Sequence, residues 1–160
     1  TRQSFILTEA LENTISLEDY CGRWSQRKPS LAIKLRLIAE LARISKVMHG
    51  NGVCHRDYYL CHFLLHDEAA FSAQQITTPQ LSLIDLHRAL IRRKLPTRWI
   101  VKDVAGLYFS ALHSGLNRHD LRFVRLYSGK SLRECFSKDV HFWQQVQRRA
   151  LQLDKKINSA

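Results

Sequence analysis

Two short stretches of the chain carry side chains that could take part in chemistry. The first, residues 55–65, opens with His55-Arg56-Asp57, and the second, residues 83–88, contains Asp85. A carboxylate such as Asp57 can accept a proton or orient a hydroxyl group. A carboxylate such as Asp85 can bind a divalent metal ion. Because phosphoryl transfer needs a positioned nucleophile and a metal that neutralises phosphate charge, the two residue types suit that reaction.

A pair of short strands could bring these carboxylates together. Apolar runs predict strands over residues 63–66 and 81–84, with an exposed polar loop over 67–80 between them. Asp57 precedes the first strand and Asp85 follows the second. Because the open ends of a hairpin lie side by side, the two carboxylates are predicted to be neighbours.

An amphipathic helix leads into the first stretch. After the N-cap candidate Ser30, apolar residues recur at spacings of three and four, which predicts a helix over 31–49. Gly50 is expected to end it as a left-handed cap. A shorter helix over 17–24 is predicted to begin after Ser16, another N-cap candidate.

The second half of the chain is predicted to be helical, over residues 100–113, 121–127 and 132–157. Asn117 or Asp120 would cap the middle helix. The last helix is basic and amphipathic, so it could dock on a membrane surface or pack on its own domain, and we favour packing. The predicted fold class is mainly α with a small β-hairpin.

Length and composition fit one domain or part of one. The chain has 160 residues, of which 45% are hydrophobic and 24% charged. No run of 18 apolar residues occurs, so no transmembrane helix is expected, and no signal peptide is visible. The four cysteines are scattered without C-x-x-C pairing, which favours a reduced cytosolic setting over disulfides or a zinc site.

The formal net charge of +11 favours polyanionic partners. Charge alone fits nucleic acid, an anionic membrane surface, a phosphorylated glycan or an acidic protein, and it also fits a basic surface with no dedicated partner. Nucleic acid is not expected, because the aromatic residues fall mostly on apolar helix faces instead of forming an exposed stacking platform.

The two stretches match part of a known motif. The catalytic loop of protein kinases is H-R-D-x-x-x-x-N, followed later by the D-F-G aspartate that binds metal. Here His62 stands at the Asn position, and Asp85 stands at the D-F-G aspartate. The order helix, loop, strand pair, aspartate and helices resembles the C-terminal lobe of a protein-kinase-like fold. With the further matching stretches 98–103 and 106–110, the chain resembles the lipopolysaccharide core heptose kinases of the WaaP/RfaP family.

This resemblance implies transfer of the ATP γ-phosphate to a heptose hydroxyl of the lipopolysaccharide inner core. Asp57 would orient or deprotonate the hydroxyl, and Arg56 would assist, either by pairing with a carboxylate or by contacting phosphate. Asp85 would bind Mg²⁺ between the phosphates. His62 could bind metal, contact phosphate or only pack, because histidine is a poorer Mg²⁺ ligand than an oxygen donor.

The resemblance also divides the chain. Residues 1–15, with a strand over 4–8, would be the last strand of the N-terminal lobe and the hinge, where Glu9 and Leu11 meet the nucleotide. Residues 16–160 would be the C-terminal lobe. No G-x-G-x-x-G occurs. The glycine-rich loop and lysine of the N-terminal lobe are therefore expected outside this chain, which alone should be inactive.

The implied partners are the lipopolysaccharide inner core, an anionic membrane surface and possible acidic proteins such as acyl carrier protein. The implied location is cytoplasmic, peripheral on the inner membrane. Two alternatives stay open: a related kinase acting on a Kdo sugar or a protein tyrosine, and a non-catalytic kinase-like binding module.

Four further polar residues have expected roles. His55 is expected to be a packed, hydrogen-bonded core histidine, and Asp103 to anchor the backbone of the catalytic loop. Arg88 could pair with a carboxylate or with phosphate. His87 is expected to be structural or exposed.

Overall fold

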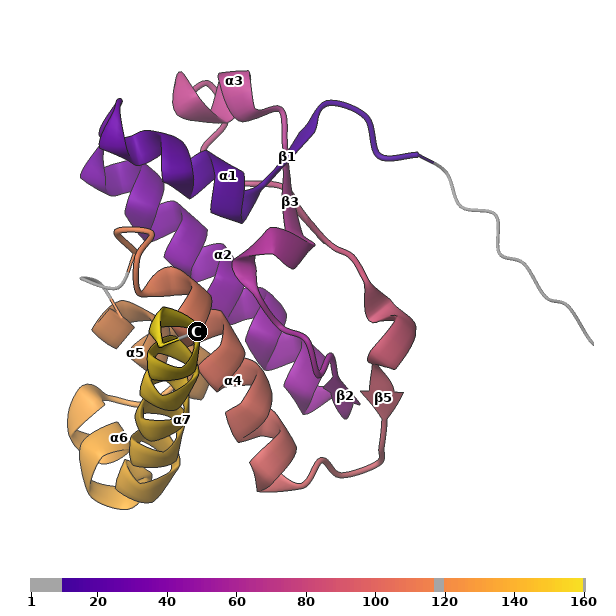
Figure 1. Ribbon diagram of the computed structural model, residues 1–160, viewed down its shortest axis with the longest axis vertical. Helices are drawn as coiled ribbons and strands as arrows, with labels where there is room; N and C mark the ends of the chain where they lie inside the picture. Colours follow the sequence, from indigo (N-terminus) through magenta and orange to yellow (C-terminus); the bar gives the residue numbers. More distant parts are fainter. Residues whose placement is uncertain (1–9, 117–119, 160) are drawn as a thin grey trace, which may run out of the picture.

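The computed structural model describes residues 10–116 and 120–159, and it is mainly helical with small antiparallel sheets, as predicted (Figure 1). The predicted strand over 4–8 lies outside the described residues. Helix α2, Leu31–Gly50, crosses the middle of the molecule. Its first turn is capped by Ser30, whose Oγ accepts a hydrogen bond from the Ile33 amide at 3.3 Å.

The predicted left-handed cap at Gly50 is wrong. The helix continues through Gly50, and Asn51 caps it. The side-chain and backbone nitrogens of Asn51 both donate to the Val47 carbonyl, at 2.8 and 3.0 Å. The left-handed residue is Gly52, which directly follows the cap and has a φ of 75°.

The strands form two small antiparallel sheets. In the larger, β1 (Thr14–Ser16) and β4 (Leu81–Leu83) flank β3 (Phe63–His66). The β3–β4 hairpin confirms the prediction, with Phe63 opposite Leu83. The smaller sheet joins β2 (Val53–Cys54) to β5 (Leu90–Ile91). Strands β1, β2 and β5 were not predicted, because two or three residues are too few to show an alternating pattern.

The segment between β3 and β4 is only partly the exposed loop that was predicted. It contains a short helix, α3, Glu68–Ser72, whose Phe71 is fully buried in the main core. The Ser72 hydroxyl lies 3.0 Å from the Tyr20 hydroxyl of α1, Leu17–Gly22. Burial of a phenyl ring therefore holds this connection against the first helix.

Four helices complete the fold: α4 (Thr97–Ala111), α5 (Asp120–Ser128), α6 (Leu132–Lys138) and α7 (Val140–Asn158). Helix α5 packs against α2, and α7 packs against α4. The predicted helix over 132–157 is two helices, because Asp139, at φ −109° and ψ 17°, leaves helical geometry.

Helix α7 packs on its own domain, the alternative that the sequence favoured. Its buried stripe consists of Trp143, Val146 and Ala150. The middle helix is confirmed from Asp120 onward, whereas its other cap candidate, Asn117, lies outside the described residues.

All four cysteines are free thiols. Cys21, Cys54 and Cys135 are buried, and burial raises the pKa of both Cys21 and Cys54 to about 12. Cys61 is half-buried, and burial raises its pKa as well. Over residues 10–116 and 120–159, none of the helices combines the length and the apolar character needed to cross a bilayer.

Candidate active site

The backbone of the His55-Arg56-Asp57 loop is held by a buried carboxylate. Asp103, on α4, has no exposed surface. Its Oδ2 accepts a hydrogen bond from the His55 amide at 2.7 Å, and its Oδ1 accepts one from the Arg56 amide at 2.8 Å. The structure thus confirms Asp103 as the anchor of the loop backbone.

Asp103 is also the end of a buried polar chain. The Nε2 atom of His49, on α2, lies 3.4 Å from Asp103 Oδ2, and its Nδ1 lies 2.9 Å from the Tyr127 hydroxyl of α5. Burial alone raises the pKa of Asp103, but the hydrogen bonds from His49 and from the loop amides outweigh it and hold this pKa below its ordinary value. The carboxylate is therefore ionised and fixed in place.

Two site residues have strained backbones. Arg56 has φ 77° and Asp85 has φ 62°, both in the left-handed region that side chains other than glycine seldom occupy. Such conformations cost on the order of 1–3 kcal/mol each and persist where surrounding contacts enforce them. At Arg56 the enforcing contact is the bond from its amide to Asp103.

His55 connects the loop to the strand that precedes Asp85. Its side chain is fully buried, as predicted, and its Nε2 donates to the Ile84 carbonyl at 2.9 Å. The Ile84 amide in turn donates to the His62 carbonyl at 3.0 Å. These two bonds fix the point at which the chain turns into Asp85.

His62 links the two predicted catalytic carboxylate residues. Its Nδ1 lies 2.6 Å from the Asp57 backbone carbonyl, and its Nε2 lies 3.4 Å from Asp85 Oδ2. A carbonyl only accepts hydrogen bonds, so Nδ1 carries a proton. In the neutral ring the Nε2 lone pair then faces the Asp85 carboxylate. These two atoms repel unless a proton or a metal cation lies between them.

Asp85 is a half-exposed carboxylate at the centre of this group, with 40% of its side chain exposed. The His87 Nδ1 lies 2.5 Å from its Oδ1, and this hydrogen bond holds the pKa of Asp85 below its ordinary value. His87 is itself exposed, as expected. In the part of the chain that the structure describes, three or more histidine, cysteine or carboxylate side chains do not converge as a metal cage.

Arg88 orients the Asp57 side chain. Its Nη1 lies 3.0 Å from both carboxylate oxygens, and 18% of the Asp57 side chain is exposed. Arg88 therefore pairs with a carboxylate, one of its two expected roles. The Arg56 side chain is half-buried.

Of the two predicted hinge residues, only Leu11 belongs to the described part of the chain. Glu9 lies outside the described residues. Leu11 is 46% exposed in the segment before β1. The structure thus brings together Asp57, His62 and Asp85, and the roles of the two hinge residues stay predictions.

Sequence reasoning missed residues that support the loop from α4. The Ser110 hydroxyl accepts a hydrogen bond from the Leu60 amide at 3.0 Å. A Cβ atom on Gly106 would lie 3.0 Å from the Tyr58 carbonyl, so the loop packs directly on the helix backbone. The glycine and serine in the stretch 106–110 were visible in the sequence, but their contacts span about fifty positions and no local pattern reveals them.

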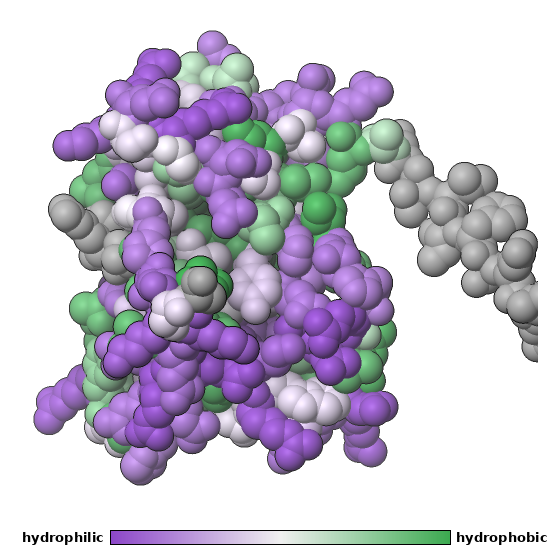
Figure 2. Space-filling model, viewed as in Figure 1, coloured by the Kyte–Doolittle hydropathy of each residue, from purple (hydrophilic) through white to green (hydrophobic). Residues whose placement is uncertain are grey.

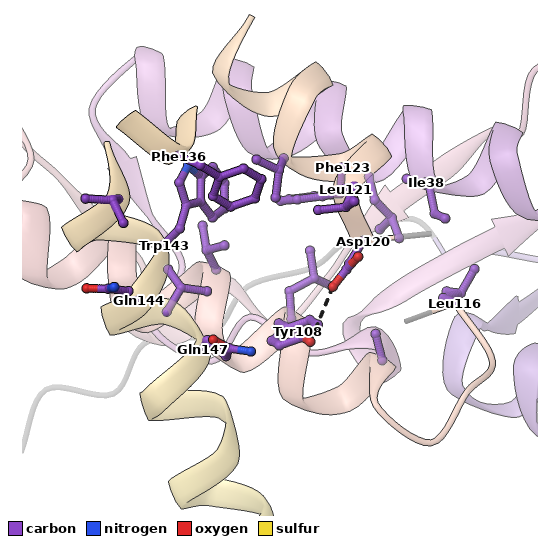
Figure 3. A pocket seen from close by; sticks show the side chains of 17 residues that line it. Ile38, Tyr108, Leu116, Asp120, Leu121, Phe123, Phe136, Trp143, Gln144 and Gln147 are labelled. Atoms are coloured by element: carbon purple, nitrogen blue, oxygen red, sulfur yellow. Dashed lines mark hydrogen bonds between the residues drawn. The ribbon is translucent and has the colours of Figure 1, made fainter. Parts of the chain in front are cut away.

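A separate apolar cavity of about 360 Å³ lies among α2, α4, α5, α6 and α7 (Figure 3). Phe136, Trp143 and Phe123 are among its aromatic lining residues. On one side of it, the Tyr108 hydroxyl donates to the Asp120 carboxylate at 3.4 Å. Neither Asp57 nor Asp85 lines this cavity.

Known proteins resemble the chain over most of its length. A lipopolysaccharide core heptose(I) kinase WaaP from Escherichia coli (strain K12) is 49% identical over 138 residues, which are 86% of this chain and 51% of that protein. Its counterpart in Pseudomonas aeruginosa is 44% identical over 153 residues, which are 95% of this chain and 56% of that protein. The chain thus spans about half the length of these curated relatives.

A solved structure and a family model point the same way. The structure, described as WaaP in complex with acyl carrier protein, matches with a TM-score of 0.80 and 43% identity over 90% of this chain and 59% of that one. The model of the lipopolysaccharide kinase (Kdo/WaaP) family matches residues 1–127. Since that match covers well over half of the 160 residues, the chain belongs to the lipopolysaccharide kinase (Kdo/WaaP) family.

Proposed function

We propose that the protein transfers the γ-phosphate of ATP to a heptose hydroxyl of the lipopolysaccharide inner core. The observation that carries this proposal is the link from the Asp57 backbone through His62 to the Asp85 carboxylate. A phosphotransferase needs one carboxylate for the acceptor hydroxyl and one for the metal, held at a fixed separation. The names of the curated relatives supply the acceptor.

Asp57 serves the acceptor hydroxyl. Its carboxylate is partly exposed, so an incoming hydroxyl can reach it, and Arg88 fixes its orientation. The bonds from Asp103 to the loop amides hold the backbone on which Asp57 stands. A carboxylate positioned in this way aligns the nucleophile and accepts its proton as the phosphorus–oxygen bond forms.

Asp85 is the proposed ligand of Mg²⁺. Magnesium in such sites takes one or two carboxylates, and phosphate oxygens and water complete its shell, so a single half-exposed carboxylate fits it without a protein cage. The metal would neutralise charge on the phosphates during transfer. The Nε2 atom of His62 faces the same space and would contact the metal or a phosphate oxygen.

The described residues supply the proposed C-terminal lobe. We propose that residues 1–15 are the last strand of the N-terminal lobe and the hinge, with Glu9 and Leu11 beside the nucleotide, and that 16–160 form the C-terminal lobe. The chain's coverage of 51–57% of its curated relatives supports this division. Without a glycine-rich loop and a strand lysine, the 160-residue chain alone would turn over negligibly.

Acyl carrier protein is a proposed partner. The solved relative is described in complex with acyl carrier protein, and the net charge of +11 suits an acidic protein. The apolar cavity among α4, α5 and α7 is of a size and chemistry that an acyl chain could occupy. With a membrane-bound glycolipid as acceptor, the protein would work as a peripheral protein on the cytoplasmic face of the inner membrane.

The test of the function is phosphate transfer by the full-length protein with Asp57→Asn. The variant should lose about 10²- to 10⁴-fold in kcat, the contribution of a positioned general base. Its melting temperature should stay unchanged, because among the described residues the Asp57 side chain pairs only with the exposed Arg88. Asp154→Asn, which removes a surface partner of His113, is the matched control and should keep full activity.

The acceptor is tested in the same assay. Heptose-bearing core, Kdo-bearing core and a tyrosine peptide are offered with labelled ATP, and only the first should be labelled. Labelling of another acceptor would show that the protein is a related kinase that acts on that acceptor. No labelling of any acceptor by the wild-type protein would make it a non-catalytic binding module.

A further inference from the structure

The segment that follows Asp85 is basic and exposed, and it carries two exposed apolar side chains. Residues 86–98, here called the basic segment, run from Asp85 to the start of α4. From Arg88 to Lys102 the sequence holds six lysine and arginine residues and no aspartate or glutamate. All charged side chains in this run are therefore positive, and the run begins three residues after Asp85.

Most of this charge has no ion-pair partner among the residues that the structure describes. Arg88 pairs with Asp57. Over residues 10–116 and 120–159, by contrast, four exposed cations of the basic segment form no ion pair: Arg92, Arg93, Lys94 and Arg98. Their charge is available to a partner outside the chain.

Two large apolar side chains project from the same segment. Ile91 is 74% exposed on β5, and Leu86 is 53% exposed in the turn directly after Asp85. The region around β5 is mainly hydrophilic in the space-filling view, with hydrophobic surface at the edge of the molecule (Figure 2). Exposed apolar residues among unpaired cations are the composition by which proteins bind the boundary between headgroups and acyl chains.

The basic segment is also tied to the candidate site at two points. Its first residue follows Asp85 directly. Its strand β5 pairs with β2, with Cys54 opposite Leu90, and β2 leads directly into His55. A surface bound to this segment therefore lies next to Asp57 and Asp85.

We propose that the basic segment docks the protein on an anionic lipid surface, with Ile91 entering the headgroup boundary and Arg92, Arg93 and Lys94 contacting lipid phosphates. The proposal rests on the proposed function, because a glycolipid acceptor is what makes docking beside the site useful. Charge complementarity and the apolar tip together favour a lipid surface over an acidic protein, which would need no inserted isoleucine. Docking would hold the acceptor hydroxyls within reach of Asp57.

The test measures binding of the full-length protein to vesicles without ATP or acceptor. Vesicles of phosphatidylethanolamine and phosphatidylglycerol (3:1) are compared with vesicles of phosphatidylcholine alone. The wild-type protein should bind the anionic vesicles, and more weakly as salt is added. The triple variant Arg92→Gln, Arg93→Gln, Lys94→Gln should lose about 100-fold in affinity, from the usual contribution of each cation near a lipid surface.

The matched control removes equal charge from exposed positions of α7, with Arg148→Gln, Arg149→Gln and Lys155→Gln. It should lose much less affinity than the basic-segment triple. Equal losses in both triples would overturn the assignment to the basic segment and leave only a diffuse attraction by net charge. Melting temperatures of both triples show whether the fold is retained.

The apolar tip has its own test. Ile91→Ser should weaken vesicle binding about tenfold, whereas Ile91→Trp should bind at least as tightly as the wild-type protein, since tryptophan favours the membrane interface. Ile157→Ser changes an isoleucine that is 62% exposed on α7 and should have no effect. If Ile91→Trp bound as weakly as Ile91→Ser, insertion of this side chain would be disproved.

The two proposals fail separately in these measurements. A wild-type protein that phosphorylates heptose but does not bind anionic vesicles would refute docking and leave the function intact. One that binds vesicles through the basic segment but labels no acceptor would refute the function alone. If the basic-segment variants bound vesicles normally but no longer bound acyl carrier protein, this surface would be a binding site for an acidic protein instead.

Discussion

At the scale of residues, the site depends on one buried carboxylate that takes no part in the proposed chemistry. Asp103 accepts hydrogen bonds from the amides of His55 and Arg56, and His49 lies against its Oδ2. These bonds hold Arg56 in its left-handed conformation, and the next residue is Asp57. The position of the proposed base is therefore determined from α4, almost fifty residues away in sequence.

Asp103→Asn should destabilise the protein by about 2–4 kcal/mol, because an amide group would place a donor against donors in a buried site. Urea unfolding measures the loss. Asp154→Asn, at a surface pair, should stay within about 1 kcal/mol of wild type. Equal losses in the two variants would contradict the anchoring role.

The same carboxylate predicts a dependence on pH. The folded-state pKa of Asp103 is lowered, so its ionised form stabilises the fold at pH values above the unfolded pKa of about 3.9. This contribution is lost as the pH falls through the folded pKa. The difference in unfolding free energy between wild type and Asp103→Asn should therefore be constant near neutral pH and shrink below about pH 4. If the difference in unfolding free energy grew as the pH fell, it would contradict a stabilising role of the ionised Asp103.

At the scale of elements, helices and strands with a strong local pattern were predictable, whereas a break within a helix and a short extra helix were not. Helix α2 and the β3–β4 hairpin were predictable, because amphipathic spacing and apolar strands are recorded in neighbouring residues. The division of the last helix at Asp139 and the short helix around Phe71 were missed. The short helix depends on the burial of Phe71 in the folded core, and no window of sequence contains that information.

The end of α2 allows a direct test at this scale. Gly50→Ala should stabilise the protein by about 0.5–1 kcal/mol, since Gly50 is helical and an added Cβ meets nothing within 4 Å. Gly52→Ala should be severely destabilising, because its φ is 75° and its Cβ would lie 1.8 Å from the Arg92 carbonyl. Thermal unfolding of the two variants should shift in opposite directions. If Gly50→Ala were destabilised instead, the left-handed conformation predicted for Gly50 from the sequence would be favoured over the helical one.

At the scale of the whole molecule, the candidate site was predictable in part. Asp57, His62 and Asp85 were selected from sequence because the spacing of the kinase-like motif is local, and the structure brings them together. The roles of these residues stay predictions. The buried chain from Tyr127 through His49 was not predictable, because it joins three helices that are far apart in the sequence.

Net charge also acts at this scale. With +11 charges, the protein should bind an anionic glycolipid acceptor less tightly as salt is added, because the Debye length falls from about 10 Å at 0.1 M to about 3 Å at 1 M. The expected result is a KM for the acceptor that rises with sodium chloride while the KM for a neutral acceptor analogue changes little. A salt-independent KM for the glycolipid would remove electrostatics from acceptor binding.

The protected thiols have a practical consequence for spectroscopy. Cys21, Cys54 and Cys135 are buried, and the raised pKa values of Cys21 and Cys54 keep these groups as unreactive thiols near neutral pH. A cysteine introduced at position 91, where the native isoleucine is 74% exposed, would react with a maleimide fluorophore or spin label far faster than they do. With the half-buried Cys61 replaced by serine, the chain would provide a nearly silent background for a single reporter beside the catalytic loop, which could follow phosphate transfer and lipid contact in real time.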